Sequence, residues 1–258
     1  MKKQSGLAKR MKEAYQDAYN IKLPKRTNVI IRLDGKSFAK YTKGLKTPFD
    51  KDFAEDMNLT AKYLCEKIQG CKLAYVQSDE ISLLLTDYDT YETSAWFDNK
   101  LQKLVSVSAS MTTSEFNRQR IRRSMYTKFG EYVKSIREYD FEKFKMGEFD
   151  SRAFIISDKE EVVNYFLWRQ QDATRNSISM TGQKYFSHRE LENKSTSEVQ
   201  EMLFKKEKVN WNDFPTRFKR GGCVLKEIKE ERTYWKIDNE PPIFSQDRNY
   251  ILNLIPKL

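Results

Sequence analysis

Two acidic positions in the sequence have the residue types and spacing for metal-dependent chemistry. Asp34 follows a short β-branched run, and Asp79-Glu80 stands between two apolar runs that read as the arms of a hairpin. Adjacent strands lie about 4.8 Å apart. Carboxylates at neighbouring strand ends can therefore share two cations about 3.5–4 Å apart, as two-metal phosphoryl transfer requires. An isolated Asp-Gly is more often an ordinary turn, so that alternative stays open here.

Magnesium suits such carboxylates because it prefers oxygen ligands and keeps several positions for water and substrate phosphates. Gly35, directly after Asp34, could let the backbone approach a metal or phosphate closely.

Other common catalytic groups are scarce in the sequence. His188 is the single histidine, and Cys65, Cys71 and Cys223 form no Cys-x-x-Cys pair. One histidine with scattered cysteines cannot build a typical structural zinc site, and it leaves little room for triad chemistry. We expect His188 to be a loop or surface residue and the cysteines to be ordinary reduced thiols.

The charge balance favours a polyanionic partner. The 258 residues include 47 Lys and Arg against 37 Asp and Glu, a net charge of +10. Such a surface attracts nucleic acid, although solubility alone would also explain it. One basic stretch with interleaved aromatic residues contains Arg118, Arg120, Arg122 and Arg123. It could position RNA through phosphate contacts, or it could be a solvated charged face.

Neither a membrane span nor a secretory signal is expected. No run of about eighteen apolar residues occurs in the sequence. The basic N-terminus lacks the apolar stretch that a signal peptide needs. We therefore expect a cytoplasmic protein.

Hydrophobic periodicity predicts the elements that must position these residues. Strands are predicted at 28–33, 73–76, 81–85, 149–157, 223–228 and 233–237, and helices at 6–20, 50–69, 94–119, 159–183 and 197–206. This order predicts an α+β fold with helices on one face of an antiparallel sheet. A chain of this length is one large domain or two intimate ones.

Four segments resemble motifs of the tRNA-His guanylyltransferase family, in that family's order. Residues 31–38 resemble Arg-Ile-Asp-Gly-x-x-Phe, and residues 74–82 resemble Tyr-x-Gln-Ser-Asp-Glu-x-Ser. Residues 149–152 are similar to Phe-Asp-Gly-Arg, with Ser151 in place of glycine, and residues 168–172 are similar to Trp-Arg-Gln-x-Asp. Residues 221–225 loosely match a further strand, so the resemblance covers most of the chain.

The resemblance implies a palm like that of polymerases and nucleotide cyclases, with flanking helices and a helical C-terminal extension. Residues 1–140 would form the catalytic core with the metal site. Residues 141–258 would complete the sheet and contact tRNA. Members of the family add nucleotides to the 5′ end of tRNA in the 3′–5′ direction, after ATP activates the 5′ phosphate. The implied cofactors are two Mg²⁺ ions, the substrates are ATP and GTP or another nucleoside triphosphate, and the assembly is a homotetramer.

The matched motifs also imply roles for individual residues. Asp34 and Asp79 match the metal-binding carboxylates, with the Gly35 carbonyl as a further ligand and Glu80 as a catalytic neighbour. The residues implied for nucleotide binding are Arg32, Lys36, Ser37, Phe38, Lys46, Ser78, Lys103 and Arg152. Those assigned to tRNA binding are Arg118, Arg120, Arg122, Arg123, Asp172 and Asn176. Any one of the basic residues could instead be a solvated surface charge, and we expect Trp168 to pack in the core.

The stretch after residue 172 departs from the guanylyltransferase branch. There the family reads Cys-His-Ile-Asn-Asn-Leu-Tyr, whereas this chain has Thr174 in place of the histidine. Because that stretch is associated with selection of tRNA-His in eukaryotes, the chain looks more like the bacterial and archaeal branch, which repairs 5′-truncated tRNA. Addition of G to tRNA-His, a nucleotide cyclase or diguanylate-type synthase, and a tRNA-binding module without catalysis remain the alternatives.

Overall fold

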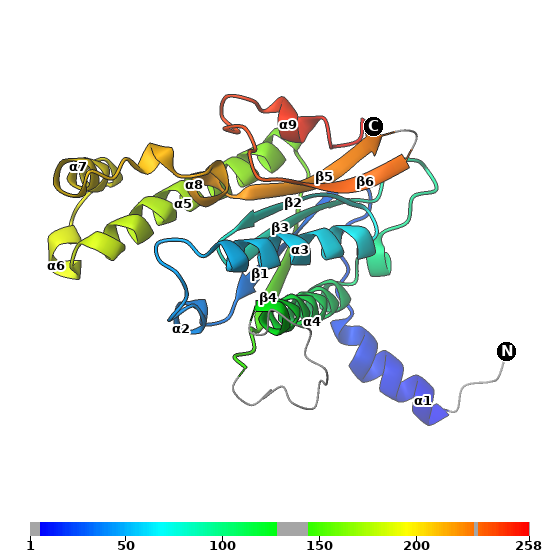
Figure 1. Ribbon diagram of the computed structural model, residues 1–258. Helices are drawn as coiled ribbons and strands as arrows, with labels where there is room; N and C mark the ends of the chain where they lie inside the picture. The colour runs from blue at the N-terminus through cyan, green and yellow to red at the C-terminus, as the bar shows by residue number, and fades with distance from the viewer. Residues whose placement is uncertain (1–5, 128–143, 230–231, 258) are drawn as a thin grey trace.

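The computed structural model describes residues 6–127, 144–229 and 232–257. Six strands in this part of the chain form one sheet in the order β4-β1-β3-β2-β5-β6, and each neighbouring pair is antiparallel (Figure 1). The strands are β1 Asn28–Gly35, β2 Cys71–Gln77, β3 Glu80–Thr86, β4 Phe149–Ile156, β5 Gly222–Lys229 and β6 Arg232–Asp238. Because β4 pairs with β1 and β5 pairs with β2, one sheet joins both halves of the chain.

Helices pack on both faces of this sheet. Helices α3 (Lys51–Lys67) and α4 (Leu101–Thr127) cover one face, and α5 (Lys159–Tyr185) and α9 (Asn249–Leu252) cover the other (Figure 1). The prediction of helices on one face is therefore wrong, because periodicity reveals a helix but not the side to which the chain crosses. Further helical segments are α2 Phe38–Tyr41, η3 Trp96–Asn99, α6 His188–Leu191, α7 Thr196–Glu207, η6 Trp211–Asp213 and α8 Thr216–Arg220.

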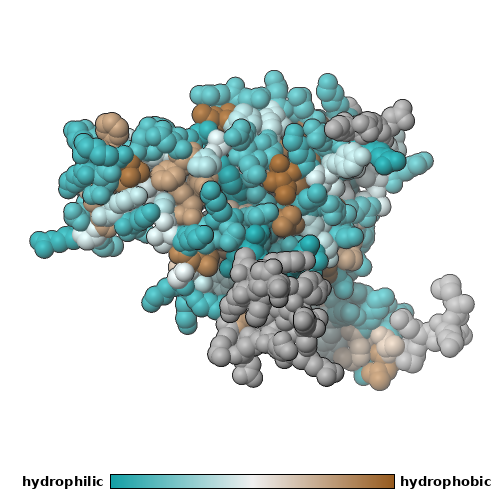
Figure 2. All heavy atoms as spheres, in the orientation of Figure 1, coloured by the Kyte–Doolittle hydropathy of each residue, from teal (hydrophilic) through white to brown (hydrophobic). Residues whose placement is uncertain are grey.

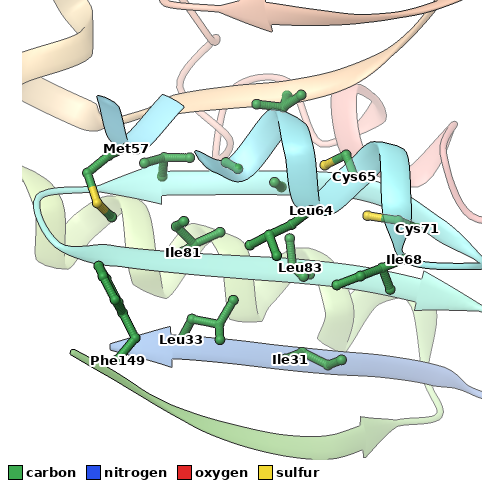
Figure 3. Packing of buried hydrophobic residues seen from close by; sticks show 14 of the residues in the cluster. Ile31, Leu33, Met57, Leu64, Cys65, Ile68, Cys71, Ile81, Leu83 and Phe149 are labelled. Atoms are coloured by element: carbon green, nitrogen blue, oxygen red, sulfur yellow. The ribbon is translucent and has the colours of Figure 1, made fainter. Parts of the chain in front are cut away.

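The side chains of β1 point alternately to the two faces of the sheet, and each face carries its own hydrophobic core. Ile31 and Leu33 are fully buried in the core beneath α3 and α4 (Figure 3). Ile30 is equally buried in the second core, against α5. Successive residues of a strand point to opposite faces. Arg32 and Asp34 therefore continue the α5 face that Ile30 begins.

Aspartate caps fix the starts of the helices α3 and α5. The Asp50 carboxylate accepts a hydrogen bond from the backbone N–H of Phe53 at 2.8 Å. The Asp158 carboxylate accepts one from the backbone N–H of Glu161 at 2.9 Å. Such caps satisfy N–H groups that the first helical turn leaves unpaired. They define where the two helices begin to cross the sheet.

The basic stretch after residue 117 lies within α4, which continues past its predicted end at 119 to Thr127. Two of its arginines hold α4 against α3. Arg120 Nη1 lies 2.9 Å from Asp56 Oδ2, and Arg123 Nε lies 2.8 Å from Asp56 Oδ1. Asp56 is only 1% exposed. These arginines therefore have a structural partner within the protein.

The N-terminal segment is helical but less regular than predicted. Helix α1 spans Gly6–Met11, and a π-helical turn at 12–16 and a 3₁₀ turn at 17–19 follow it. No residue of these three pieces is buried, and α1 projects from the body of the molecule (Figure 1).

The face of the molecule shown in Figure 2 is mainly hydrophilic. Over the described residues, no helix combines the length and the apolarity that crossing a membrane requires.

Cys65, Cys71 and Cys223 are buried free thiols, and His188 is exposed at the first position of α6, as expected for all four.

Candidate active site

The strand ends bring acidic residues together beside the β2–β3 hairpin. Asp34 pairs with Glu80 in the β1–β3 ladder and with Asp150 in the β1–β4 ladder. Asp79 follows Ser78 in the two-residue connection of the hairpin, where Ser78 has a left-handed φ of 45°. Directly paired side chains of antiparallel strands lie about 5 Å apart. The structure therefore places Asp34 beside the tip of the hairpin, and we call Asp34, Asp79 and Glu80 the acidic tip.

The surroundings of Asp79 disfavour its charged form. Burial raises its pKa, and the negative charges of Asp34 and Glu80 raise it further. Hydrogen bonds from Ser78 and from its own backbone lower the pKa and oppose this effect. A divalent cation relieves such repulsion between neighbouring carboxylates. The acidic tip therefore has the electrostatics of a cation site.

The carboxylate oxygens at the acidic tip suit a magnesium ion that takes only some of its ligands from the protein. Across residues 6–127, 144–229 and 232–257, no group of three or more His, Cys, Asp or Glu side chains is arranged to hold a metal. Magnesium does not need such a group, because it commonly binds one or two carboxylates and takes its other oxygen ligands from water and phosphates. Asp34 and Asp79 therefore fit Mg²⁺ bound together with a nucleotide, and they do not make a structural zinc site.

Glu80 is held by arginines. Its carboxylate accepts hydrogen bonds from Arg169 Nε at 2.8 Å and Arg169 Nη2 at 2.6 Å. Arg32 Nη2 lies 2.8 Å from the same carboxylate and 3.9 Å from Asp34 Oδ2. Glu80 and Arg169 side chains are 6% and 4% exposed. Glu80 thus links Arg169 to Arg32 beside Asp34, and its predicted catalytic role stays a prediction.

Arg169 is a site residue that the sequence reasoning missed, although the helical period contains a signal for it. It follows the buried Tyr165 and Phe166 by four and three residues, so it shares their face of α5. The prediction that Trp168 packs in the core is wrong. Its side chain is 48% exposed because it lies one position off that face, and the Arg169 guanidinium stacks over its ring at 4.5 Å.

A pocket of about 160 Å³ lies beside the hairpin tip. Three residues with predicted roles line it: Lys46, Ser78 and Asn176. Part of its wall is aromatic, where the rings of Phe49 and Phe218 stack with centroids 5.0 Å apart and planes 8° from parallel. Such a wall suits a flat ring system. Because Ser78 precedes the metal-binding candidate of the hairpin, the pocket adjoins the acidic tip.

Two other basic residues predicted to bind nucleotide are exposed near the strand ends. Lys36 forms an ion pair with Glu148 at 2.6 Å, and both side chains are more than half exposed. Arg152 is the β4 residue paired with Arg32 in the β1–β4 ladder, and its side chain is 59% exposed. The structure thus brings Arg32, Lys36 and Arg152 to the same end of β1.

Three further residues predicted to bind nucleotide, like Arg32, Lys36 and Arg152, do not line the pocket. Phe38 is in the core, 4% exposed, with its ring centroid 4.9 Å from that of Phe149 and 5.6 Å from that of Phe116. Its contribution is therefore packing, because apolar neighbours surround its ring. Ser37 is exposed at the start of α2, and Lys103 is exposed on the first turn of α4.

The residues predicted to contact tRNA differ in their surroundings. Arg118 pairs with Glu115 one turn earlier on α4, and Arg122 is exposed on the same helix. Asp172 accepts a hydrogen bond from Arg169, which connects it to the acidic tip. These contacts do not test whether the residues bind tRNA, so their tRNA-binding role stays a prediction.

Replacing Gly35 by alanine is expected to disturb the acidic tip. A Cβ atom at this position would lie 2.4 Å from Phe38 Cδ2, and the ring is enclosed by other core rings. Overpacking of this kind costs roughly 1–3 kcal/mol of the free energy of unfolding. Urea unfolding measures this loss of stability. Gly6→Ala is the control, because its added Cβ meets no atom within 4 Å among the described residues beyond its chain neighbours and its own helix backbone. Equal stability of the two variants would contradict the argument.

Comparisons with known proteins identify related sequences and related folds. The family model described as tRNAHis guanylyltransferase matches residues 8–157. The tRNA(His) guanylyltransferase of Debaryomyces hansenii is 29% identical over 224 residues, which cover 80% of this chain and 76% of that protein.

Among solved structures, a bacterial tRNA(His) guanylyltransferase-like protein in complex with ATP is 44% identical, with a TM-score of 0.84 and coverage of 97% of this chain and 99% of that one. The bacterial protein in complex with GTP has a TM-score of 0.79 at 44% identity, over 96% and 98% of the two chains. The Saccharomyces cerevisiae enzyme, at 22% identity, 91% and 99% coverage and a TM-score of 0.65, shares the fold.

Proposed function

Because the chain belongs to the tRNA-His guanylyltransferase family and is a nucleotidyltransferase, we propose that it adds nucleotides to the 5′ end of tRNA in the 3′–5′ direction. The observation that carries this proposal is the acidic tip, where Asp34 lies beside Asp79 and a pocket adjoins both. Carboxylates in such a position serve the cations and phosphates of a nucleotide during phosphoryl transfer.

The proposed substrate is 5′-truncated tRNA, with the opposite strand of the acceptor stem as template. Two observations support repair over strict action on tRNA-His. Thr174 stands where the guanylyltransferase branch has histidine. The identity with the bacterial guanylyltransferase-like protein is 44%, against 29% with the Debaryomyces hansenii enzyme.

The proposed reaction has two transfer steps. In the first, an oxygen of the tRNA 5′ phosphate attacks the α-phosphorus of ATP, a P–O–P bond forms and pyrophosphate leaves. In the second, the 3′-hydroxyl of an incoming nucleoside triphosphate attacks the activated 5′ phosphorus and loses its proton, and AMP leaves. Complexes of the bacterial relative with ATP and with GTP support this choice of substrates. Both steps need alignment and charge neutralisation more than a protein nucleophile.

Asp34 and Asp79, with the Gly35 carbonyl, would hold two Mg²⁺ ions. Bound magnesium supplies positive charge at phosphate oxygens. The protein's own contribution is to keep the carboxylates in place. Arg32, which pairs with Glu80 at 2.8 Å, lies 3.9 Å from the Asp34 carboxylate and places a positive charge beside it.

The test is extension of a tRNA that lacks its first nucleotide, with each of the four bases placed opposite the gap. We expect the complementary nucleotide to be added in each case, to tRNA-His and other tRNAs alike. Addition that ignores the opposing base would contradict the template-directed proposal. Incubation with ATP or GTP alone separates the alternative enzyme class, because a cyclic product would identify a cyclase.

The homotetramer and the cytoplasmic location stay predictions, and size-exclusion chromatography with light scattering tests the first.

A further inference from the structure

Trp168 is a large aromatic residue of α5 that stays half exposed near the acidic tip. Its side chain is 48% exposed, although Tyr165 and Phe166, close to it in the sequence, are buried. Single exposed hydrophobic residues are common on protein surfaces and are not evidence of a site by themselves. Trp168 differs from them because its ring is held in place and is connected to the acidic tip.

Two contacts hold the ring of Trp168. The Arg169 guanidinium lies over one face of the ring, with Cζ 4.5 Å from the centroid. The ring of Tyr165 packs with its centroid 6.0 Å away and its plane inclined at 65°. Arg169 is itself fixed by Glu80 at 2.6 Å and by Asp172 at 3.0 Å. The exposed surface of Trp168 is therefore the part of a fixed ring that these two partners leave uncovered.

Along α5, this ring and the pocket lie on opposite sides of the contact with the acidic tip. The α5 residues that line the pocket all follow Asp172, and Asn176 is one of them. Asp172 is linked through Arg169 to Glu80 of the acidic tip. Trp168 comes one turn before Asp172, so it is about 12 Å from Asn176 along the helix axis, at 1.5 Å per residue. A nucleotide in the pocket leaves the side of Trp168 open to a second substrate.

In the proposed reaction the second substrate is an RNA end that carries unpaired bases. The base opposite the gap pairs with the incoming nucleotide, and its strand continues as the single-stranded 3′ end of tRNA. The next base on that strand has no pairing partner, so it can offer its open face to an aromatic side chain. Arg175, two turns beyond Trp168 on the same side of α5, is 62% exposed and adds a positive charge near the path of the strand.

We propose that Trp168 stacks on the first unpaired base of the RNA 3′ end and thereby holds the template strand in register at the acidic tip. Stacking needs only a flat base and reads no hydrogen-bonding edge, so it is compatible with different tRNAs and with addition of every nucleotide. Trp168 is then a binding residue that touches the RNA away from the reacting atoms. This inference rests on the proposed function, because it takes 5′-truncated tRNA as the substrate.

The test uses two stem-loop RNAs that carry a 5′ phosphate and lack the first nucleotide of the stem. The short RNA ends at the base opposite the gap, and the long RNA has one further unpaired base. We expect the wild-type protein in buffer with Mg²⁺ to bind the long RNA about tenfold more tightly than the short one, as measured by fluorescence anisotropy. Equal affinity for the two RNAs would overturn the proposal without any variant being made.

The variant Trp168→Leu removes the aromatic face and keeps an apolar side chain. We expect it to bind the two RNAs within about twofold of each other, because only the long RNA loses affinity. With 2-aminopurine as the unpaired base, emission should be severalfold lower in the wild-type complex than in the variant complex, because stacking quenches this base. Equal emission in the two complexes would contradict the proposal.

Two further variants are controls for the aromatic ring. Trp168→Phe keeps a smaller ring, so we expect it to retain a preference of about threefold or more for the long RNA. Tyr91→Leu removes a 95% exposed ring from the turn that follows the other end of β3, away from the acidic tip. It should keep the tenfold preference of the wild type. Loss of the preference in Tyr91→Leu would show that the effect is not specific to Trp168.

The outcomes separate this inference from the proposed function. Failure of the wild-type protein to bind either RNA or to extend truncated tRNA would count against the function itself. Extension with equal affinity for the two RNAs would count against the role of Trp168 alone. Equal weakening of both RNAs in Trp168→Leu would assign the ring to the fold or to contact with a second copy of the chain, and either result overturns the proposal. Urea unfolding and light scattering distinguish these two results.

Discussion

Asp79→Asn is expected to lower the rate of nucleotide addition to tRNA by about a thousandfold or more. The substitution keeps the shape of the side chain and removes the charge that would bind the cations at the triphosphate. A metal ion contributes several kcal/mol of stabilisation to the transition state of phosphoryl transfer, and each 1.36 kcal/mol is a factor of about ten in rate. The assay is single-turnover extension of 5′-truncated tRNA at saturating Mg²⁺ and nucleotide.

The same substitution should leave the fold intact or make it more stable, and this separates a loss of chemistry from a loss of structure. Burial and the charge of Asp34 raise the pKa of Asp79 in the folded protein. A carboxyl with a raised folded pKa binds its proton more tightly folded than unfolded, so at neutral pH its ionised form opposes folding. Removing that charge takes away the opposition. We expect the urea midpoint of Asp79→Asn to equal or exceed that of the wild type.

The control for Asp79→Asn is Glu201→Gln. This glutamate is 61% exposed on α7, where it pairs with Lys205. It should change neither activity nor the urea midpoint measurably, because exposed ion pairs contribute little. Wild-type extension by Asp79→Asn would remove the acidic tip from the mechanism. Loss of activity together with a lower midpoint would instead assign Asp79 a structural role.

The acidic tip was predictable from the sequence because its main members follow local rules. Asp34 ends a β-branched run and Asp79 lies in a short connection between two apolar runs, so strand pairing alone brings them together. Apolar periodicity also located each strand of the sheet. These signals are local, and they do not depend on which face of the sheet a helix covers.

The parts that could not be predicted depend on contacts across the sheet. Arg169 and Glu80 are 89 positions apart, and they meet only because α5 crosses the face on which Glu80 points. Phe38 and Trp168 both belong to family motifs, yet the first is in the core and the second is half exposed. Arg217 belongs to none of the quoted motifs, and only the structure shows its burial beside the pocket.

Arg169→Met is expected to cause the largest loss of stability among the substitutions considered. The Glu80 carboxylate, 6% exposed, would lose the two hydrogen bonds of the guanidinium and keep only Arg32 as a cationic partner. Removing one partner of a buried ion pair typically costs roughly 3–5 kcal/mol, because a charge remains buried without compensation. Arg32 remains close to Glu80, so we expect a decrease in the free energy of unfolding near the lower end of that range. Urea titration followed by circular dichroism measures it.

Two further variants distinguish the burial of an unpaired charge from a simple loss of contacts at Arg169. Arg175→Met removes a guanidinium from the same helix. That guanidinium is 62% exposed and also pairs with Asp172, so its loss should change stability by less than about 0.5 kcal/mol. The double variant Glu80→Gln with Arg169→Met removes both charges. It should be more stable than Arg169→Met alone, because the uncompensated carboxylate is gone. If the double variant were the less stable of the two, the instability of Arg169→Met would not come from an uncompensated carboxylate at Glu80.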